Sequence, residues 1–353
     1  MMCLRKYTKE ELKDIEKIGI IIFGLLGDVI LRTPVIHVLK EIYPDAKIVA
    51  LVDPIGKAVL EHNPDVDEVL VFDRKKEKNK LKQNLKKIVS ILRIRKEKFD
   101  LLVNLYNAGL SRPMVFFSGA RYKLGFCQQK SKYLYNVVNE CSDDRLKEEQ
   151  SLYNYMISII EPLSDKEFSL RPVFEIESYE KETMQSYLES FGYSLEKLYT
   201  LNLASSKEDK ILSFEKYFFI VEYLYKKYGF IPAIVSNPLQ EYLQEKFINE
   251  YMSNSNIPYI KLKNLSLGEV AAVIDLTPFI VTPDTGLMHL AIALDSYILT
   301  IFTYTHPVFV DPHSEKFVSV YEAFDKGVFY QHQNISAIEL QKKITVLMQN
   351  FSS

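Results

Sequence analysis

The sequence predicts an α/β protein with two domains, each built on a doubly wound parallel sheet. Short apolar, β-branched runs alternate with segments of helical periodicity, which is the pattern of βαβ units. The alternation stops at residues 164–180, a stretch that contains Pro172, and then starts again. A chain of 353 residues is long enough for two α/β domains and too long for one ordinary core. We therefore expect domains at residues 1–172 and 173–353.

The first half contains four short apolar runs with the length and β-branched content of buried parallel strands. They cover residues 18–23, 47–52, 69–72 and 101–105. Helical periodicity predicts one helix at 29–42, which tolerates Pro34 only near its first turn. A basic helix is predicted at 78–95, and residues 131–165 are predicted to be mostly helical.

The second half repeats this pattern. Strands are predicted at residues 201–203, 231–235, 277–281 and 297–302. Helices are predicted at residues 214–228, 241–252 and 267–274. A closing amphipathic helix, at about residues 335–350, could pack back on the N-terminal domain. In such folds the loops after the carboxyl ends of the strands are the expected ligand positions.

Composition indicates a globular protein without a disulfide framework. Apolar residues make up 47% and charged residues 25% of the chain. Cys3, Cys127 and Cys141 are odd in number and form no CxxC pattern, so we expect a reducing compartment and no bound metal. The apolar run at 18–27 is too short to span a bilayer. Its glycine turn, 24–27, is not a GxGxxG, which argues against a dinucleotide redox site.

Positive charge is concentrated in residues 74–98, where twelve Lys or Arg residues stand against two Glu residues. This segment carries +10 in a chain whose net charge is −2. One interpretation is a solvated helix face. The other is a patch for anionic lipid or for a phosphorylated glycan. Nucleic acid is not the expected partner, because the basic run lacks interleaved aromatics.

The most informative short motif is 281–289, which has the sequence Val-Thr-Pro-Asp-Thr-Gly-Leu-Met-His. It follows a predicted strand and leads into apolar residues at helical spacing, so Thr285 and Gly286 are predicted at a helix N-terminus. Free N–H groups and the helix dipole can hold phosphate there, and Asp284 can accept hydrogen bonds from sugar hydroxyls. His289, about one turn further on, could reach the phosphate or pack in the core. The alternative is a plain helix cap.

Polar side chains also follow the first predicted strand of each half. Asp28 comes after the glycine-bearing turn, where a carboxylate could act as a general base on a hydroxyl. Its alternative role is the N-cap of the next helix. Ser205, Ser206 and Lys210 suit a diphosphate, because hydroxyls donate hydrogen bonds and an ammonium neutralises leaving-group charge. Their alternative is an ordinary polar loop.

Taken in order, these segments resemble the motifs of glycosyltransferase family 9, the heptosyltransferases. Residues 27–34 and 43–46 are similar to the amino-terminal signature of the family, and 284–294 is similar to its most specific motif. Further similar segments are 100–105, 119–126, 204–210 and 302–307. The matches keep their order from about residue 18 to residue 312.

The resemblance implies a GT-B fold, with two Rossmann-like domains facing across a cleft. It also implies an inverting, metal-independent sugar transfer whose only co-substrate is a nucleotide sugar, ADP-L-glycero-D-manno-heptose. The acceptor would be the inner core of a lipid A–core glycolipid of lipopolysaccharide or lipooligosaccharide. The N-terminal domain would bind the acceptor and the C-terminal domain the donor. Such an enzyme would be cytoplasmic and peripheral, at the anionic cytosolic face of the bacterial inner membrane.

Carried over residue by residue, the resemblance makes Asp28 the catalytic base and Lys210 the catalytic cation. The donor would be bound by Ser205, Ser206, Lys210, Gln240, Glu241, Leu265, Asp284, Thr285, Gly286 and His289. The candidate acceptor contacts are Lys75, Lys76, Arg112 and Arg121.

The sequence departs from the family pattern near the expected nucleotide. Residues 235–238 replace a glycine-rich turn, and Thr303-Tyr304 replaces Gly-Pro. These departures leave two alternatives open: transfer of a different sugar, or a non-catalytic protein that binds sugar nucleotides. The presence of both Asp28 and Lys210 favours an enzyme.

Overall fold

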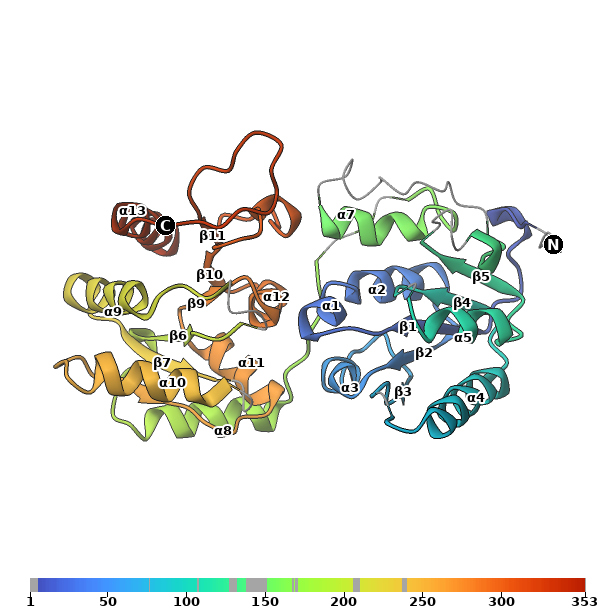
Figure 1. The fold of residues 1–353 in the computed structure, drawn as a ribbon, viewed down its shortest axis with the longest axis horizontal. Coiled ribbons are helices and arrows are strands. Elements are labelled where there is room, and N and C mark those ends of the chain that lie inside the picture. The colour runs from blue at the N-terminus through green and yellow to red at the C-terminus, as the bar shows by residue number, and fades with distance from the viewer. Residues whose placement is uncertain are drawn as a thin grey trace. The chain divides into compact units, whose positions relative to one another are not determined.

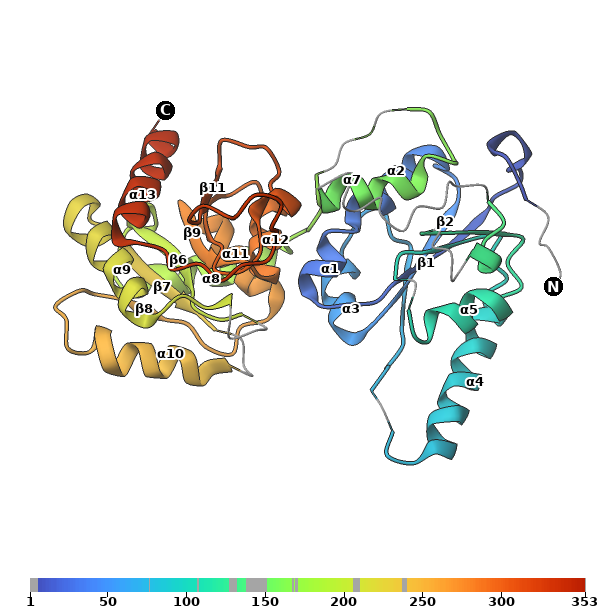
Figure 2. The same cartoon turned by 45° about the horizontal axis from the view of Figure 1, so that its top comes forward.

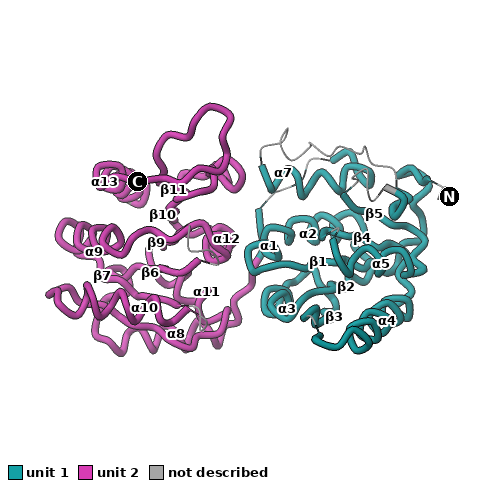
Figure 3. The backbone as a smooth tube through the Cα atoms, in the orientation of Figure 1, with its two compact units in different colours: residues 1–173 teal, residues 174–353 magenta. Residues whose placement is uncertain are grey.

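Two parallel β-sheets, each with helices on both sides, organise the fold (Figure 1; Figure 2). The structure is a computed structural model. It describes residues 6–75, 77–106, 108–126, 132–137, 151–166, 168, 171–205, 210–236 and 240–352. The sheets belong to two compact units, residues 1–173 and 174–353 (Figure 3). Each unit is thus a doubly wound α/β domain, as the sequence predicts.

The sheet of unit 1 has the strand order β3-β2-β1-β4-β5, and its pairings are parallel. Its strands are β1 (Lys17–Ile22), β2 (Lys47–Val52), β3 (Glu68–Val71), β4 (Leu101–Asn104) and β5 (Tyr122–Gly125). β1 is buried from Ile18 onward, which explains why it is a continuous apolar run. The strand order reverses between β1 and β4, and the crevice beside such a point is where α/β sheets bind ligands.

The helices of unit 1 include two pairs that pack against each other. Its helices are α1 (Leu26–Ile30), α2 (Thr33–Ile42), α3 (Pro54–Leu60), α4 (Lys80–Glu97), α5 (Ser111–Phe117) and α7 (Leu152–Ile157), with short 3-10 turns η1 (Lys9–Glu11), η2 (Lys132–Leu134) and η3 (Ser158–Ile160). α1 contacts α3, and α4 contacts α5. Of the segment 131–165, only the described parts can be compared with the predicted helix, and they contain η2, α7 and η3.

The single helix predicted at 29–42 is wrong, because the structure has two helices there. α1 ends at Ile30, and α2 begins at Thr33 with Pro34 in its first turn. In one continuous helix the ring of Pro34 would clash with the carbonyl of Ile30 and leave it without an N–H donor. That carbonyl instead accepts a hydrogen bond of 2.8 Å from the Thr33 hydroxyl.

The sheet of unit 2 has the order β11-β10-β9-β6-β7-β8, and its pairings are parallel. Its strands are β6 (Leu198–Asn202), β7 (Ile231–Val235), β8 (Ile260–Lys261), β9 (Phe279–Pro283), β10 (Tyr297–Ile301) and β11 (Phe317–Val320). Counted from β6, this is the 3-2-1-4-5-6 order of a dinucleotide-binding Rossmann sheet. Its switch point lies between β6 and β9.

The helices of unit 2 pack around a core that includes the end of the chain. They are α8 (Ser178–Glu189), α9 (Phe214–Tyr228), α10 (Glu241–Phe247), α11 (Leu267–Leu276), α12 (Gly286–Ala293) and α13 (Ala337–Ser352), with the short turns η4 (Leu195–Lys197) and η8 (Pro307–Phe309) and the π-helical turn η7 (Ile248–Met252). The linker predicted at 164–180 overlaps the start of α8. The apolar face of α13, with Leu340, Ile344 and Leu347, is buried in the core of unit 2.

None of the helices in the described ranges combines the length and the apolar content that crossing a bilayer requires.

Candidate active site

Most of the predicted site residues lie at the carboxyl edges of the two sheets, next to the switch points. Asp28 follows β1 in unit 1. In unit 2, Ser205 and Lys210 follow β6, whereas Asp284 and Thr285 follow β9. The first group belongs to unit 1 and the second to unit 2.

Asp28 is held in place by the turn that follows β1. It occupies the third position of α1, and its Oδ2 accepts a hydrogen bond of 2.9 Å from the backbone N–H of Leu25. Leu25 is the N-cap residue, so the alternative that made Asp28 the N-cap is wrong. The side chain of Asp28 is nevertheless exposed. A carboxylate fixed by its backbone contact and open to solvent can meet a substrate hydroxyl.

Gly24 makes room for this carboxylate. Its φ of +148° lies in a region that L side chains rarely adopt, and a Cβ there would lie 2.6 Å from Cβ and 2.7 Å from Oδ2 of Asp28. Gly24→Ala is therefore expected to displace Asp28 and lower turnover by about tenfold or more, besides straining the backbone by about 1–3 kcal/mol. Turnover and thermal unfolding of the purified protein measure the two effects.

Gly119→Ala is the matched control for Gly24→Ala. Gly119 also has a positive φ, +76°, and belongs to the same unit, but the nearest atom to its Cβ would be 3.9 Å away, on Arg95. It should destabilise the protein similarly and leave the turnover of the folded fraction unchanged. Equal turnover in the two variants would show that Gly24 does not position Asp28.

Arg74, which follows β3, lies beside this turn. It contacts residues at the carboxyl ends of β1, β2 and β4. The Nε and Nη2 of Arg74 donate to Oδ1 and Oδ2 of Asp53 at 2.6 and 2.5 Å, a bidentate pair that raises the pKa of Arg74. The backbone N–H of Gly24 also donates to Asp53 Oδ2, at 3.1 Å. The guanidinium lies 4.6 Å from the ring centroids of both Phe23 and Tyr106. Next to Asp28, this edge therefore carries a guanidinium that a salt bridge and two aromatic rings hold in place.

A second cation lies below the same turn. Arg32 is only 8% exposed, and its Nη1 donates to the carbonyl of Phe23 at 2.9 Å. Burial lowers the pKa of Arg32, and the negative charge of Asp28 opposes this shift. Its Nε has no hydrogen-bond partner among the residues that the structure describes. Sequence reasoning missed Arg32 and Asp53, and it counted Arg74 only as part of a basic run.

In unit 2, α12 begins at Gly286 with Thr285 as its N-cap residue, as predicted. The Thr285 hydroxyl makes no cap hydrogen bond to the helix. It lies instead 3.3 Å from Nδ2 of Asn202 and 3.4 Å from the hydroxyl of Thr282. The plain-cap alternative is therefore weakened, because the N–H groups of the first turn are not satisfied by this side chain and remain suited to an anion.

Asn202, which was not among the residues predicted from the sequence, connects the two strands at this switch point. It is the last residue of β6, and its Nδ2 also donates to Thr282 Oγ1, in β9, at 3.0 Å. Its Oδ1 accepts from the N–H of Ala204 at 3.1 Å. The sequence signal that could have identified Asn202 is a polar amide at the end of an apolar strand.

Lys210 and Asp284 form an ion pair across the same edge. Their side chains are 21% and 10% exposed, so the pair is mostly buried but within reach of a ligand. The nearby Ser205 is 2% exposed, and its hydroxyl has no partner among the described residues. Gln240 fixes the backbone of Ser205, because its Nε2 donates to the Ser205 carbonyl at 2.5 Å. A buried hydroxyl without a partner beside a lysine and a helix N-terminus fits a phosphate oxygen.

The other predicted donor residues have different surroundings. Glu241 forms an ion pair of 2.7 Å with Lys263, which is also paired with Glu245. Leu265 is partly buried against the core of unit 2, and His289 is buried within α12. Ser206 lies outside the described residues.

The structure brings only some of the predicted acceptor residues to the edge that carries Asp28. Lys75 follows β3 and is exposed, and Arg112 lies in the first turn of α5, which follows β4. Arg121 directly precedes β5, so it lies at the opposite, amino edge of the sheet, 4.8 Å above the Tyr122 ring. Lys76 lies outside the described residues. Because every strand of this sheet is parallel, Arg121 cannot share the site of Asp28.

No group of three or more His, Cys, Asp or Glu side chains suited to a metal ion occurs within the part of the chain that the structure describes.

Comparison with known proteins identifies one family. The family description "Glycosyltransferase family 9 (heptosyltransferase)" matches residues 90–334. Lipopolysaccharide heptosyltransferase 3 of Escherichia coli is 23% identical over 311 residues, which cover 83% of this chain and 85% of that protein.

Solved structures share the fold over nearly the whole chain. The glycosyltransferase family 9 protein of Veillonella parvula superposes with a TM-score of 0.78 at 20% identity, covering 95% of this chain and 98% of that one. The E. coli ADP-heptose lipopolysaccharide heptosyltransferase II gives a TM-score of 0.73 at 19% identity, covering 94% and 99%.

Proposed function

The chain belongs to glycosyltransferase family 9, the heptosyltransferase family, and we propose that it transfers heptose from ADP-heptose to the inner core of lipopolysaccharide or lipooligosaccharide. Its fold is GT-B, and it is a glycosyltransferase. The observation that supports the proposal is the group of Lys210, Ser205 and the N-terminus of α12 at the carboxyl edge of the sheet in unit 2. These groups suit a phosphate. The names of the relatives supply the sugar and the acceptor class.

We assign the donor diphosphate to unit 2. The first-turn N–H groups of α12 and the Ser205 hydroxyl would donate to phosphate oxygens, and the Lys210 ammonium would offset the charge that develops on the leaving group. Asp284, paired with that lysine, would accept hydrogen bonds from the hydroxyls of the sugar. This set of groups meets the charge of the leaving ADP with protein cations and dipoles, so the proposed transfer needs no metal ion.

Asp28 would be the base in unit 1. The acceptor hydroxyl gives its proton to the carboxylate as its oxygen bonds to the anomeric carbon of the heptose. The bond from that carbon to the diphosphate oxygen breaks, and ADP leaves with the electron pair. Attack from the face opposite the diphosphate inverts the anomeric centre. Arg74, held in place by Asp53, would offer its remaining N–H groups as hydrogen-bond donors to the acidic groups of a core acceptor.

The test is transfer by the purified protein. With ADP-heptose and a heptose-deficient core glycolipid, we expect the acceptor mass to increase by one heptose, and we expect full activity in excess EDTA. Loss of activity with EDTA that added metal restores would contradict the proposed charge neutralisation. Transfer from a different nucleotide sugar, with none from ADP-heptose, would overturn the donor. Binding of ADP-heptose without turnover on any core acceptor would favour the non-catalytic alternative.

A lipid A–core acceptor is anchored in a bilayer, so the enzyme would act peripherally at the cytosolic face of the inner membrane.

A further inference from the structure

We propose that α4 docks the protein on an anionic lipid bilayer by lying in the headgroup interface with an aliphatic stripe inserted among the acyl chains. The inference deepens the proposed function and rests on it for the reason to meet a membrane. Its physical evidence is the surface of α4 itself.

The stripe consists of four aliphatic side chains that face solvent. Leu81, Leu85, Ile88 and Leu92 are 79%, 62%, 53% and 58% exposed, and Val89 beside them is 55% exposed. Their spacing of four, three and four residues places them on one side of the helix. A helix of a globular protein normally turns such a stripe to the core. Here the buried residues are Ser90 and Ile94, on the opposite side.

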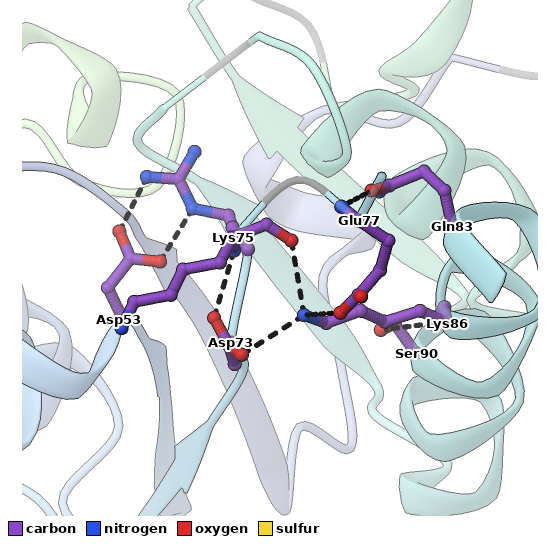
Figure 4. Close-up of polar contacts among 8 residues, drawn as sticks. Asp53, Asp73, Lys75, Glu77, Gln83, Lys86 and Ser90 are labelled. Carbon is purple, nitrogen blue, oxygen red and sulfur yellow. Dashed lines mark hydrogen bonds and ion pairs between the residues drawn. The ribbon is translucent and has the colours of Figure 1, made fainter. Parts of the chain in front are cut away.

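Specific polar contacts hold the helix in this orientation. Lys86 Nζ contacts Asp73 at 3.0 Å, the Lys75 carbonyl at 3.2 Å and Glu77 at 3.4 Å (Figure 4). The Gln83 side chain accepts from the N–H of Glu77 at 2.6 Å. The segment before the helix is therefore fastened to its inner face through Lys86 and Gln83. Rolling the stripe inward would break these contacts.

The border of the stripe is cationic. Lys80, Lys82, Lys87, Arg95 and Lys96 are exposed along α4. Glu97, the acidic residue of this helix, is paired with Lys17 at 2.8 Å. Long cationic side chains on both sides of an apolar stripe are typical of interfacial helices, since their stems lie along the apolar region and their charges reach anionic headgroups.

This charge favours a bilayer over a second copy of the chain. Two copies paired through the stripe would bring their lysine borders together, and like charges oppose such contact. An anionic bilayer offers both the apolar layer and the opposite charge. In Figure 2, α4 extends beyond the rest of unit 1. The neighbouring helix α5 packs against α4 and exposes Phe116 and Phe117.

Binding of the full chain to lipid vesicles without any acceptor glycolipid tests the inference. We expect the protein to float with vesicles of phosphatidylcholine and phosphatidylglycerol, to bind pure phosphatidylcholine at least tenfold more weakly, and to dissociate as salt rises. Replacing Leu81, Leu85, Ile88 and Leu92 by Gln should weaken binding at least tenfold. Replacing Lys80, Lys82 and Lys87 by Gln should weaken it severalfold and flatten the salt dependence.

The matched control replaces equally exposed apolar residues elsewhere, Tyr242 and Ile338, by Gln. It should bind vesicles as the unaltered protein does. The inference fails if the four-residue stripe variant binds normally, if lipid charge makes no difference, or if the stripe variant changes only the oligomeric state measured by light scattering. The last result would assign the stripe to a second copy.

Failure of docking and failure of the proposed function give different results. The stripe variant should turn over a deacylated, water-soluble core acceptor at the normal rate. Vesicle binding with no transfer to any acceptor would overturn the function and leave the docking intact. Transfer without vesicle binding would do the reverse.

Discussion

Asp28→Asn is expected to lower turnover by about 100-fold or more while the affinity for the donor nucleotide stays the same. A positioned general base contributes about 10²–10⁴ to rate, and an amide cannot accept the proton of the acceptor hydroxyl. The substitution keeps the local structure, because an Asn oxygen can still accept the hydrogen bond that the N–H of Leu25 gives to Asp28 Oδ2. Steady-state kinetics with saturating donor, and calorimetric titration with ADP, measure the two quantities.

Asp45→Asn is a suitable control for Asp28→Asn, since Asp45 is an exposed carboxylate in the turn after α2 of the same unit. It should leave both quantities unchanged. If Asp28 acts only through its backbone contact in the first turn of α1, Asp28→Asn would also turn over near normally. That result would remove Asp28 from the mechanism and leave it a structural residue.

Except for the partly buried edge strand β3, the strands that the sequence predicted are buried on both faces. β2 and β7 lie at their predicted bounds, because a buried parallel strand must be apolar throughout and stands out as a run. β5, β8 and β11 were not predicted. β8 has only two residues, and β5 and β11 interrupt their apolar character with Lys123 and Ser319, so none of them has a distinct pattern.

The site residues could be predicted where a single loop contains the reactive side chains and follows a recognisable strand. Asp28 and Asp284-Thr285-Gly286 each follow an apolar run directly, which predicts a carboxyl edge. The pair of Asp53 and Arg74 joins two different strand ends, so it becomes visible only once β2 and β3 are neighbours. Arg121 was misplaced for the same reason: without β5, nothing in the sequence shows that it precedes a strand.

Periodicity alone also gave an incomplete account of α4. An apolar stripe on a basic helix predicts the side that meets the core, and the charge pattern of this helix distinguishes only a solvated face from a bound one. The structure shows that Lys86 and Gln83 fasten the opposite side, which also buries Ile94, and that the stripe faces out. The direction of an amphipathic helix depends on contacts outside the helix, which its own sequence does not contain.

Lys210→Ala is expected to lower kcat/KM for the donor by about 100-fold or more. Removing one preorganised group that stabilises developing charge typically costs 10²–10³ in rate. Here the loss is compounded, because Lys210 is paired with Asp284. Without the lysine, that carboxylate would remain mostly buried and unpaired beside an incoming diphosphate, so donor affinity should also fall.

Combining Lys210→Ala with Asp284→Asn separates the two roles, with kcat/KM and ADP affinity as the measurements. If Asp284 is only the partner of Lys210, neutralising it should restore part of the ADP affinity and part of kcat/KM. If it also binds the sugar hydroxyls, ADP affinity should recover while kcat/KM for the full donor stays low. Lys316→Ala is the control, since Lys316 pairs with Asp295 at 2.8 Å on an exposed surface of the same unit, where an ion pair contributes little. Normal kinetics for Lys210→Ala would contradict the assignment of the diphosphate to this edge.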